Sequence, residues 1–129
     1  MTTPSKKNFS KLIKDGGIPP TYREIPYSSP YLVYESLMSP NSFLLESVKG
    51  PENIARYSFI GFDPYLTFKV KDGAVEINTK DKRAVSSSNP LTRLKSLVDA
   101  YRQAPKKALP PFQGGAAGLL SYDFVRYLE

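Results

Sequence analysis

Two short runs of the sequence place polar side chains beside apolar, strand-like residues. Residues 42–47 read Ser-Phe-Leu-Leu-Glu-Ser, and residues 56–61, Arg-Tyr-Ser-Phe-Ile-Gly, begin nine positions after Ser47. Residues 43–45 have the bulk that favours a buried strand. The Glu46 carboxylate and the Ser47 hydroxyl at its exit must therefore be hydrated or hydrogen-bonded.

These residue types suit a small ligand that carries both charges. Glu46 can accept hydrogen bonds from an ammonium group, and Ser47 can donate or accept. Arg56 can hold a carboxylate through two parallel hydrogen bonds. Together they would recognise a free amino acid. The alternative is that Glu46 and Ser47 merely end a strand and that Arg56 is a surface charge, because loops after strands are usually polar.

Three ordered motifs resemble one family. Leu44-Leu45-Glu46-Ser47, residues 56–61, and residues 114–123 (Gly-Gly-Ala-Ala-Gly-Leu-Leu-Ser-Tyr-Asp) resemble the amino-terminal region of anthranilate synthase component I, a chorismate-utilising enzyme. The similarity runs from about residue 20 to residue 129. The resemblance implies that Leu45, Glu46 and Ser47 bind tryptophan, the end product that inhibits the enzyme. It extends, less directly, to Arg56 and Tyr57 on a neighbouring strand.

The same resemblance implies an enzyme whose chemistry lies elsewhere. The family converts chorismate and ammonia to anthranilate and pyruvate, in tryptophan biosynthesis, with magnesium. A glutamine amidotransferase subunit, component II, delivers the ammonia. The residues for chorismate and magnesium belong to the carboxy-terminal half, which has no counterpart here. We therefore expect no catalytic residue, metal ligand or cofactor in this chain, and no turnover by these 129 residues alone.

Two other functions fit the same motifs. Component I of aminodeoxychorismate synthase, in the folate pathway, shares the fold and can retain a structural tryptophan site. A stand-alone regulatory module that binds an amino acid without catalysis is the second alternative. Residues 44–47 together with residues 58–61 favour anthranilate synthase.

The composition excludes several kinds of catalytic and metal-binding site. The chain has no cysteine and no histidine, which excludes disulfides, the usual zinc sites and every Ser-His or Cys-His catalytic arrangement in these residues. Residues 1–15 lack the apolar run of a signal peptide, and no stretch approaches the roughly 20 apolar residues that span a bilayer. We expect a soluble cytoplasmic protein with no membrane partner.

The formal charge of +6 raises the question of a nucleic-acid partner. Residues 1–30 carry five Lys or Arg against two Asp or Glu, and residues 80–107 carry eight against two. These clusters fall on a tail and around a helix, without the interleaved aromatics and glycines of a base-stacking groove. Solvated basic surfaces are the better interpretation, and we expect no nucleic-acid binding.

Glycines and carboxylates elsewhere form no recognised site. The run at residues 114–118 lacks the Gly-Lys-Ser/Thr ending of a phosphate-binding loop, and its glycine spacing does not match a dinucleotide fingerprint. We interpret it as part of a buried strand, residues 114–122, whose glycines allow close backbone approach. The acidic residues form no local cluster for magnesium or for acid-base catalysis.

The expected fold is α+β, with an antiparallel sheet packed against helices, as the first part of the family's two-sheet α/β/β/α architecture. Residues 1–19 form a mobile tail or a short helix, and residues 20–129 form the amino-terminal domain, truncated before the chorismate-binding half. One helix is expected from Pro30, with Ser29 as the cap, to a point before Pro40. Another is expected over residues 90–103, with Asn89 as the cap. A further helix begins at residue 123.

The expected strands are residues 42–47, 56–62, 65–71, 74–78 and 114–122. Asp72-Gly73 predicts a two-residue hairpin between the third and fourth of these strands. Residues 80–88, rich in polar residues, are expected to form a mobile connector. Apolar surface left exposed where the missing half belongs predicts self-association of the isolated segment.

Overall fold

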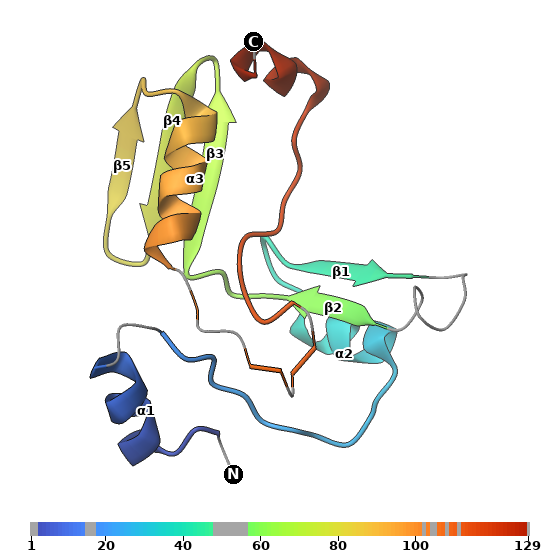
Figure 1. Ribbon diagram of the computed structural model, residues 1–129. Helices are drawn as coiled ribbons and strands as arrows, with labels where there is room; N and C mark the ends of the chain where they lie inside the picture. Colours follow the sequence, from blue (N-terminus) through green and yellow to red (C-terminus); the bar gives the residue numbers. More distant parts are fainter. Residues whose placement is uncertain are drawn as a thin grey trace. The chain divides into compact units, whose positions relative to one another are not determined.

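The structure is a computed structural model that describes residues 3–14, 18–47, 57–101, 103, 106–107, 109–110 and 112–128 (Figure 1). Helices and two small antiparallel sheets make up the described part, so the α+β prediction is confirmed. Figure 1 labels the first eight elements in chain order: α1 (Lys6–Lys14), α2 (Pro30–Leu37), β1 (Phe43–Glu46), β2 (Ser58–Gly61), β3 (Leu66–Lys71), β4 (Ala74–Thr79), β5 (Arg83–Ser86) and α3 (Pro90–Ala100). A 3₁₀ helix, η1 (Tyr122–Tyr127), follows.

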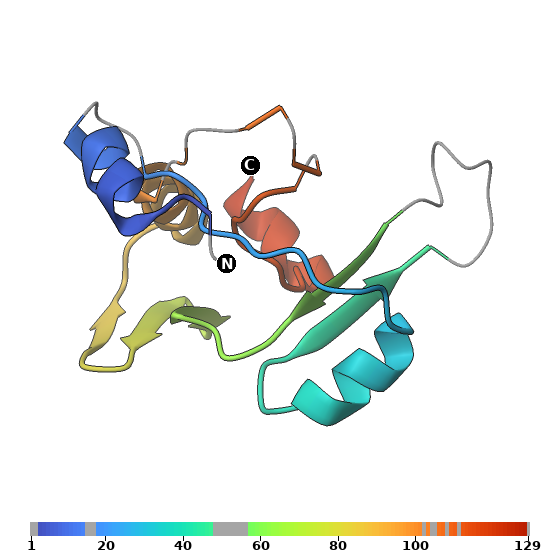
Figure 2. The same ribbon diagram turned by 90° about the horizontal axis from the view of Figure 1, so that it is seen from below.

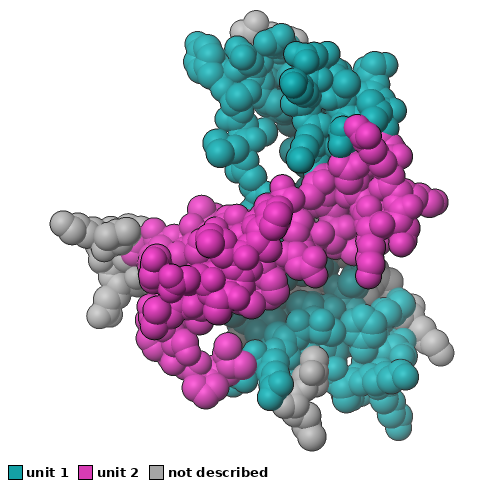
Figure 3. Space-filling view, turned by 180° about the vertical axis from the view of Figure 1, so that it is seen from behind, with its two compact units in different colours: residues 1–24, 68–76, 85–129 teal, residues 25–67, 77–84 magenta. Residues whose placement is uncertain are grey.

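The chain divides into two compact units (Figure 3). Unit 1 comprises Met1–Glu24, Phe68–Glu76 and Val85–Glu129, and unit 2 comprises Ile25–Thr67 and Ile77–Ala84. Unit 2 contains α2 and the candidate site; unit 1 contains α1, α3 and η1.

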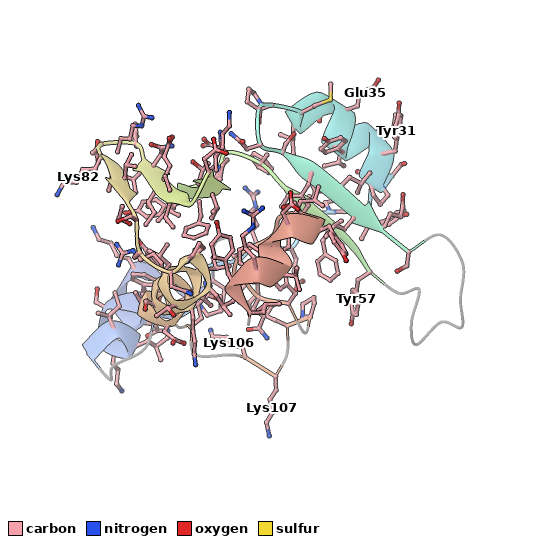
Figure 4. All side chains as sticks on the ribbon, turned by 90° about the horizontal axis from the view of Figure 1, so that it is seen from above. Tyr31, Glu35, Tyr57, Lys82, Lys106 and Lys107 are labelled. Atoms are coloured by element: carbon pink, nitrogen blue, oxygen red, sulfur yellow. The ribbon has the colours of Figure 1, made fainter. Side chains whose placement is uncertain are left out.

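In unit 2, α2 packs against the two-stranded ribbon formed by β1 and β2 (Figures 1 and 2). Proline at the first position of α2 has the fixed φ that a helix start requires. One side of α2 is half-buried, while Tyr31 and Glu35, one turn apart, lie on its exposed side (Figure 4). The helix and both strands are shorter than the predicted segments but lie within them.

The second sheet has the strand order β3-β4-β5. The predicted hairpin is confirmed: Asp72 and Gly73 both have positive φ, at 51° and 78°, as a type I′ turn requires. Val75 and Ile77 are buried, and because side chains two apart share a face of a strand, they define one buried face of β4.

The expectation of a mobile connector over residues 80–88 is wrong in part, because β5 lies within it. The backbone turns back at Thr79, whose N–H donates to the Lys82 carbonyl oxygen at 2.8 Å. The Thr79 hydroxyl also accepts a bond from the Lys82 N–H at 3.1 Å. Lys82 projects from this turn (Figure 4). Every residue of β5 is exposed, so the segment lacks the buried apolar positions by which a strand is recognised in a sequence. It forms a strand through backbone pairing with β4.

Helix α3 begins as the sequence predicts. The Asn89 side chain accepts a hydrogen bond from the Thr92 N–H at 3.1 Å, and Pro90 occupies the first turn. The helix ends at Ala100, three residues before the expected end. Large apolar side chains of the helix and of its C-cap, Leu91, Val98 and Tyr101, are exposed.

The expectation of a buried strand over residues 114–122 is wrong for the described structure. Residues 114–121 form no regular element, and every residue from 114 to 122 is exposed, with Leu119 96% and Tyr122 93% exposed. A strand requires a neighbour for its backbone groups, and the described residues pair none with this segment. The helix expected from residue 123 is the 3₁₀ helix η1, which begins at Tyr122 with Ser121 as its cap. Its Phe124 is buried, and the ring centroids of Phe124 and Tyr127 lie 5.4 Å apart.

At the amino-terminal end, α1 occupies part of the segment for which a tail or short helix is expected. Its first turn is marked by the bond from the Phe9 N–H to the Ser5 carbonyl oxygen at 2.9 Å. Among the helices of the described part, none combines the length and the apolar character needed to traverse a lipid bilayer.

Candidate functional site

The β1–β2 ribbon positions the predicted ligand-binding residues. The strands are antiparallel, with Phe43 opposite Gly61 and Glu46 opposite Ser58. A side chain on Gly61 would overlap the Phe43 ring, so the glycine allows this ring to lie over the partner strand. The register brings the end of β1 and the start of β2 together at one end of the ribbon.

Leu45, Glu46 and Ser47 lie at that end and are all exposed. Tyr57 immediately precedes β2 and is half-buried (Figure 4). Its ring lies 6.2 Å from the ring of Phe59, at an interplanar angle of 38°. The structure thus brings four of the five predicted residues to the same end of the ribbon. The fifth, Arg56, lies outside the described residues.

The predicted residues divide between the two faces of the ribbon. Leu45 is opposite Phe59 in the register, and Glu46 is opposite Ser58. Because successive side chains of a strand point to opposite faces, Leu45 and Phe59 share one face, while Glu46 and Ser58 share the other. A single ligand that contacts both Glu46 and Leu45 would therefore bind around this end of the ribbon, not on one face.

The carboxylate of Glu46 has a hydrogen-bond donor that the sequence interpretation missed. The Ser58 hydroxyl donates to Glu46 Oε1 at 3.2 Å, across twelve positions of sequence. The signal that could have revealed it is the antiparallel pairing of residues 42–47 with residues 56–61, but the register of that pairing was needed to place Ser58 opposite Glu46.

The glycine-rich run has a different role from a phosphate loop. Gly114 and Gly115 have φ of 141° and 148°, and a side chain on Gly114 would collide with the Gln103 side chain. Just before it, Gln113 bonds to the backbone of Lys106 twice: its Oε1 accepts from the N–H and its Nε2 donates to the carbonyl oxygen, both at 2.8 Å. These contacts hold Gln113 against the backbone of Lys106, next to the glycine run.

The described residues offer no metal centre. Nowhere in the ranges that the structure describes do three or more His, Cys, Asp or Glu side chains gather closely enough to hold an ion.

Comparison with known proteins places these features in a family. No protein-family model matches the chain. Anthranilate synthase component 1 of Synechocystis is 33% identical over 136 residues, which is 100% of this chain and 26% of that protein. Its counterpart in Pseudomonas putida is 39% identical over 107 residues, covering 80% of this chain and 22% of the relative. Aminodeoxychorismate synthase component 1 of Bacillus subtilis is 41% identical over 86 residues, 67% of this chain and 17% of the relative.

The chain thus spans about a quarter of the length of the component 1 relatives that it matches. These relatives define the class as the chorismate-utilising enzymes. Within that class, the chain belongs to the anthranilate synthase component 1 family, whose members match most of its length.

Proposed function

We propose that this chain is the tryptophan-binding, feedback-inhibited part of an anthranilate synthase component 1. The observation that carries the proposal is the exposed Glu46-Ser47 pair where β1 ends, in a chain of this family. Glu46 would accept the ammonium group of tryptophan, and Ser47 would add a hydrogen bond. Arg56 would hold the carboxylate, and Leu45 with Tyr57 would contact apolar parts of the ligand.

The full-length enzyme would convert chorismate and ammonia to anthranilate, with the ammonia supplied by a glutamine amidotransferase subunit. Magnesium and chorismate would be held by the carboxy-terminal half of that enzyme, so we assign no step of this chemistry to residues of this chain. The 129 residues alone would then show no turnover. The rest of the full-length polypeptide would close the site around the indole. The compartment would be the cytoplasm, which a cysteine-free sequence fits.

Tryptophan inhibition of the full-length enzyme tests the proposal. Ser47→Ala removes a hydrogen bond to the ligand and should raise the tryptophan concentration for half-inhibition about ten-fold, as the loss of about 1.4 kcal/mol does. Anthranilate formation without tryptophan should be retained. Fluorescence of anthranilate measures both quantities. Inhibition identical to that of the unmodified enzyme would make Ser47 structural and contradict its assigned role.

Component 1 of aminodeoxychorismate synthase is a second candidate, because the relative with that name is 41% identical over its matched residues. In this case the full-length enzyme would release aminodeoxychorismate, with no anthranilate or pyruvate. Chromatography of the products formed from chorismate and ammonia separates the two functions.

A further inference from the structure

We propose that Ser58 positions Glu46 for the ammonium group of the inhibitor, so that β2 contributes to feedback sensitivity through a residue that need not touch the ligand. This inference rests on the proposed tryptophan site. It adds a positioning residue that the sequence motifs do not assign.

The geometry of the ribbon end supports this role. Glu46 and Ser58 are directly opposite in the antiparallel register, so their side chains leave the same face as close neighbours. The Ser58 hydroxyl donates to Glu46 Oε1 at 3.2 Å. Glu46 is the last residue of β1 and Ser58 is the first residue of β2, so the bond joins the terminal pair of the ribbon.

The chemistry of the bond suits a carboxylate that must also receive a cation. An ionised carboxylate only accepts hydrogen bonds, and its two oxygens can accept several. The bond from Ser58 therefore leaves acceptor capacity for an ammonium group and keeps the negative charge of Glu46. A basic side chain in place of Ser58 would instead neutralise that charge.

The hydrogen bond from Ser58 restricts the side chain of Glu46 before the ligand binds. Glu46 is exposed, and a long side chain in water samples many rotamers that binding must restrict. A partner that already restricts them reduces this entropic cost and strengthens binding. Tyr57 and Phe59 flank Ser58 along the chain and point to the opposite face, so a small change at Ser58 need not disturb their ring contact.

A purely structural role is the alternative, in which the bond only stabilises the end of the ribbon. Both roles allow Ser58→Ala to lower the melting temperature. Only the positioning role requires that the effect on inhibition depend on Glu46, so a double-mutant cycle separates them.

The experiment measures tryptophan inhibition in the full-length enzyme for Ser58→Ala, Ser58→Thr, Glu46→Ala and the Ser58→Ala/Glu46→Ala pair. Each half-inhibition concentration is read against the variant's own uninhibited rate. Ser86→Ala is the matched control, because Ser86 also ends an exposed strand and its hydroxyl pairs with that of Ser88 at 3.0 Å. This control should leave inhibition unchanged.

Ser58→Ala should raise the half-inhibition concentration roughly three- to five-fold, the effect of losing one solvent-exposed hydrogen bond of ordinary net strength. Ser58→Thr keeps the hydroxyl and should restore most of the sensitivity, and Ser58→Ala should add little when Glu46 is already alanine. Unchanged inhibition in Ser58→Ala, with weakened inhibition in Glu46→Ala, would overturn this inference and leave the proposed site standing. Equal effects of Ser58→Ala with and without Glu46 would also overturn it. If neither Glu46→Ala nor Ser47→Ala alters inhibition, the proposed tryptophan site itself is wrong.

Discussion

At the scale of single residues, the structure assigns different tasks to neighbouring positions of the same strands. Glu46 has a cross-strand hydrogen bond, whereas Leu45 belongs to the face that carries Phe59. Gly61 has a third task, because its missing side chain makes room for the Phe43 ring. These tasks follow from the alternation of side chains along paired strands.

Gly61→Ala should destabilise the intact protein by about 1–3 kcal/mol, because the added methyl group forces the Phe43 ring out of its place. Urea unfolding followed by circular dichroism measures the change in the free energy of unfolding. Gly118→Ala is the matched control, since an added methyl group there meets nothing within 4 Å. Equal urea midpoints for the two variants would contradict this prediction, because they would show that the Phe43 ring moves aside without lowering the free energy of unfolding.

At the scale of elements, short-range signals determine the helix starts and the tight turn. Asn89 and Ser29 occupy the same position before a helix whose first residue is proline, but only Asn89 makes a capping bond from its side chain. The two helices thus offer a direct comparison of a cap that forms its hydrogen bond with one that does not.

Asn89→Ala should lower the free energy of unfolding by about 1 kcal/mol, because the Thr92 N–H loses its partner at the start of α3. Ser29→Ala, whose side chain makes no such bond, should cost much less. Thermal unfolding of the two variants compares them. A larger loss in Ser29→Ala than in Asn89→Ala would contradict the assignment of the caps.

At the scale of the whole molecule, large apolar side chains remain exposed on several described segments. They include Leu119, Leu120 and Tyr122, which follow the glycine run. Large exposed apolar surface is typical of interaction sites, and the chain spans about a quarter of its relatives' length. We therefore propose that the remainder of the full-length polypeptide covers these residues.

The isolated 129-residue chain should self-associate, because the exposed apolar side chains have no other cover in solution. Light scattering coupled to size-exclusion chromatography should give a mass above 14.4 kDa that rises with protein concentration. The double variant Leu119→Lys/Leu120→Lys should shift the distribution toward the monomer. A constant monomer mass at all concentrations would refute the prediction.

The amino-acid sequence by itself determined the features whose causes lie within a few residues. Asn89-Pro90 starts a helix and Asp72-Gly73 turns a hairpin because a capping side chain and residues that tolerate positive φ act locally. The amino-acid site at Glu46 and Ser47, which the polar groups at the end of an apolar strand suggested, stays a prediction.

Only the tertiary structure decided which residues face one another. The register of β1 and β2 placed Ser58 beside Glu46 and Phe59 beside Leu45, which no spacing along one strand can reveal. The same reason explains the failed strand at residues 114–122 and the unexpected strand β5. A strand exists only when another strand satisfies its backbone, so pairing partners, and not local residue types, decide whether it forms.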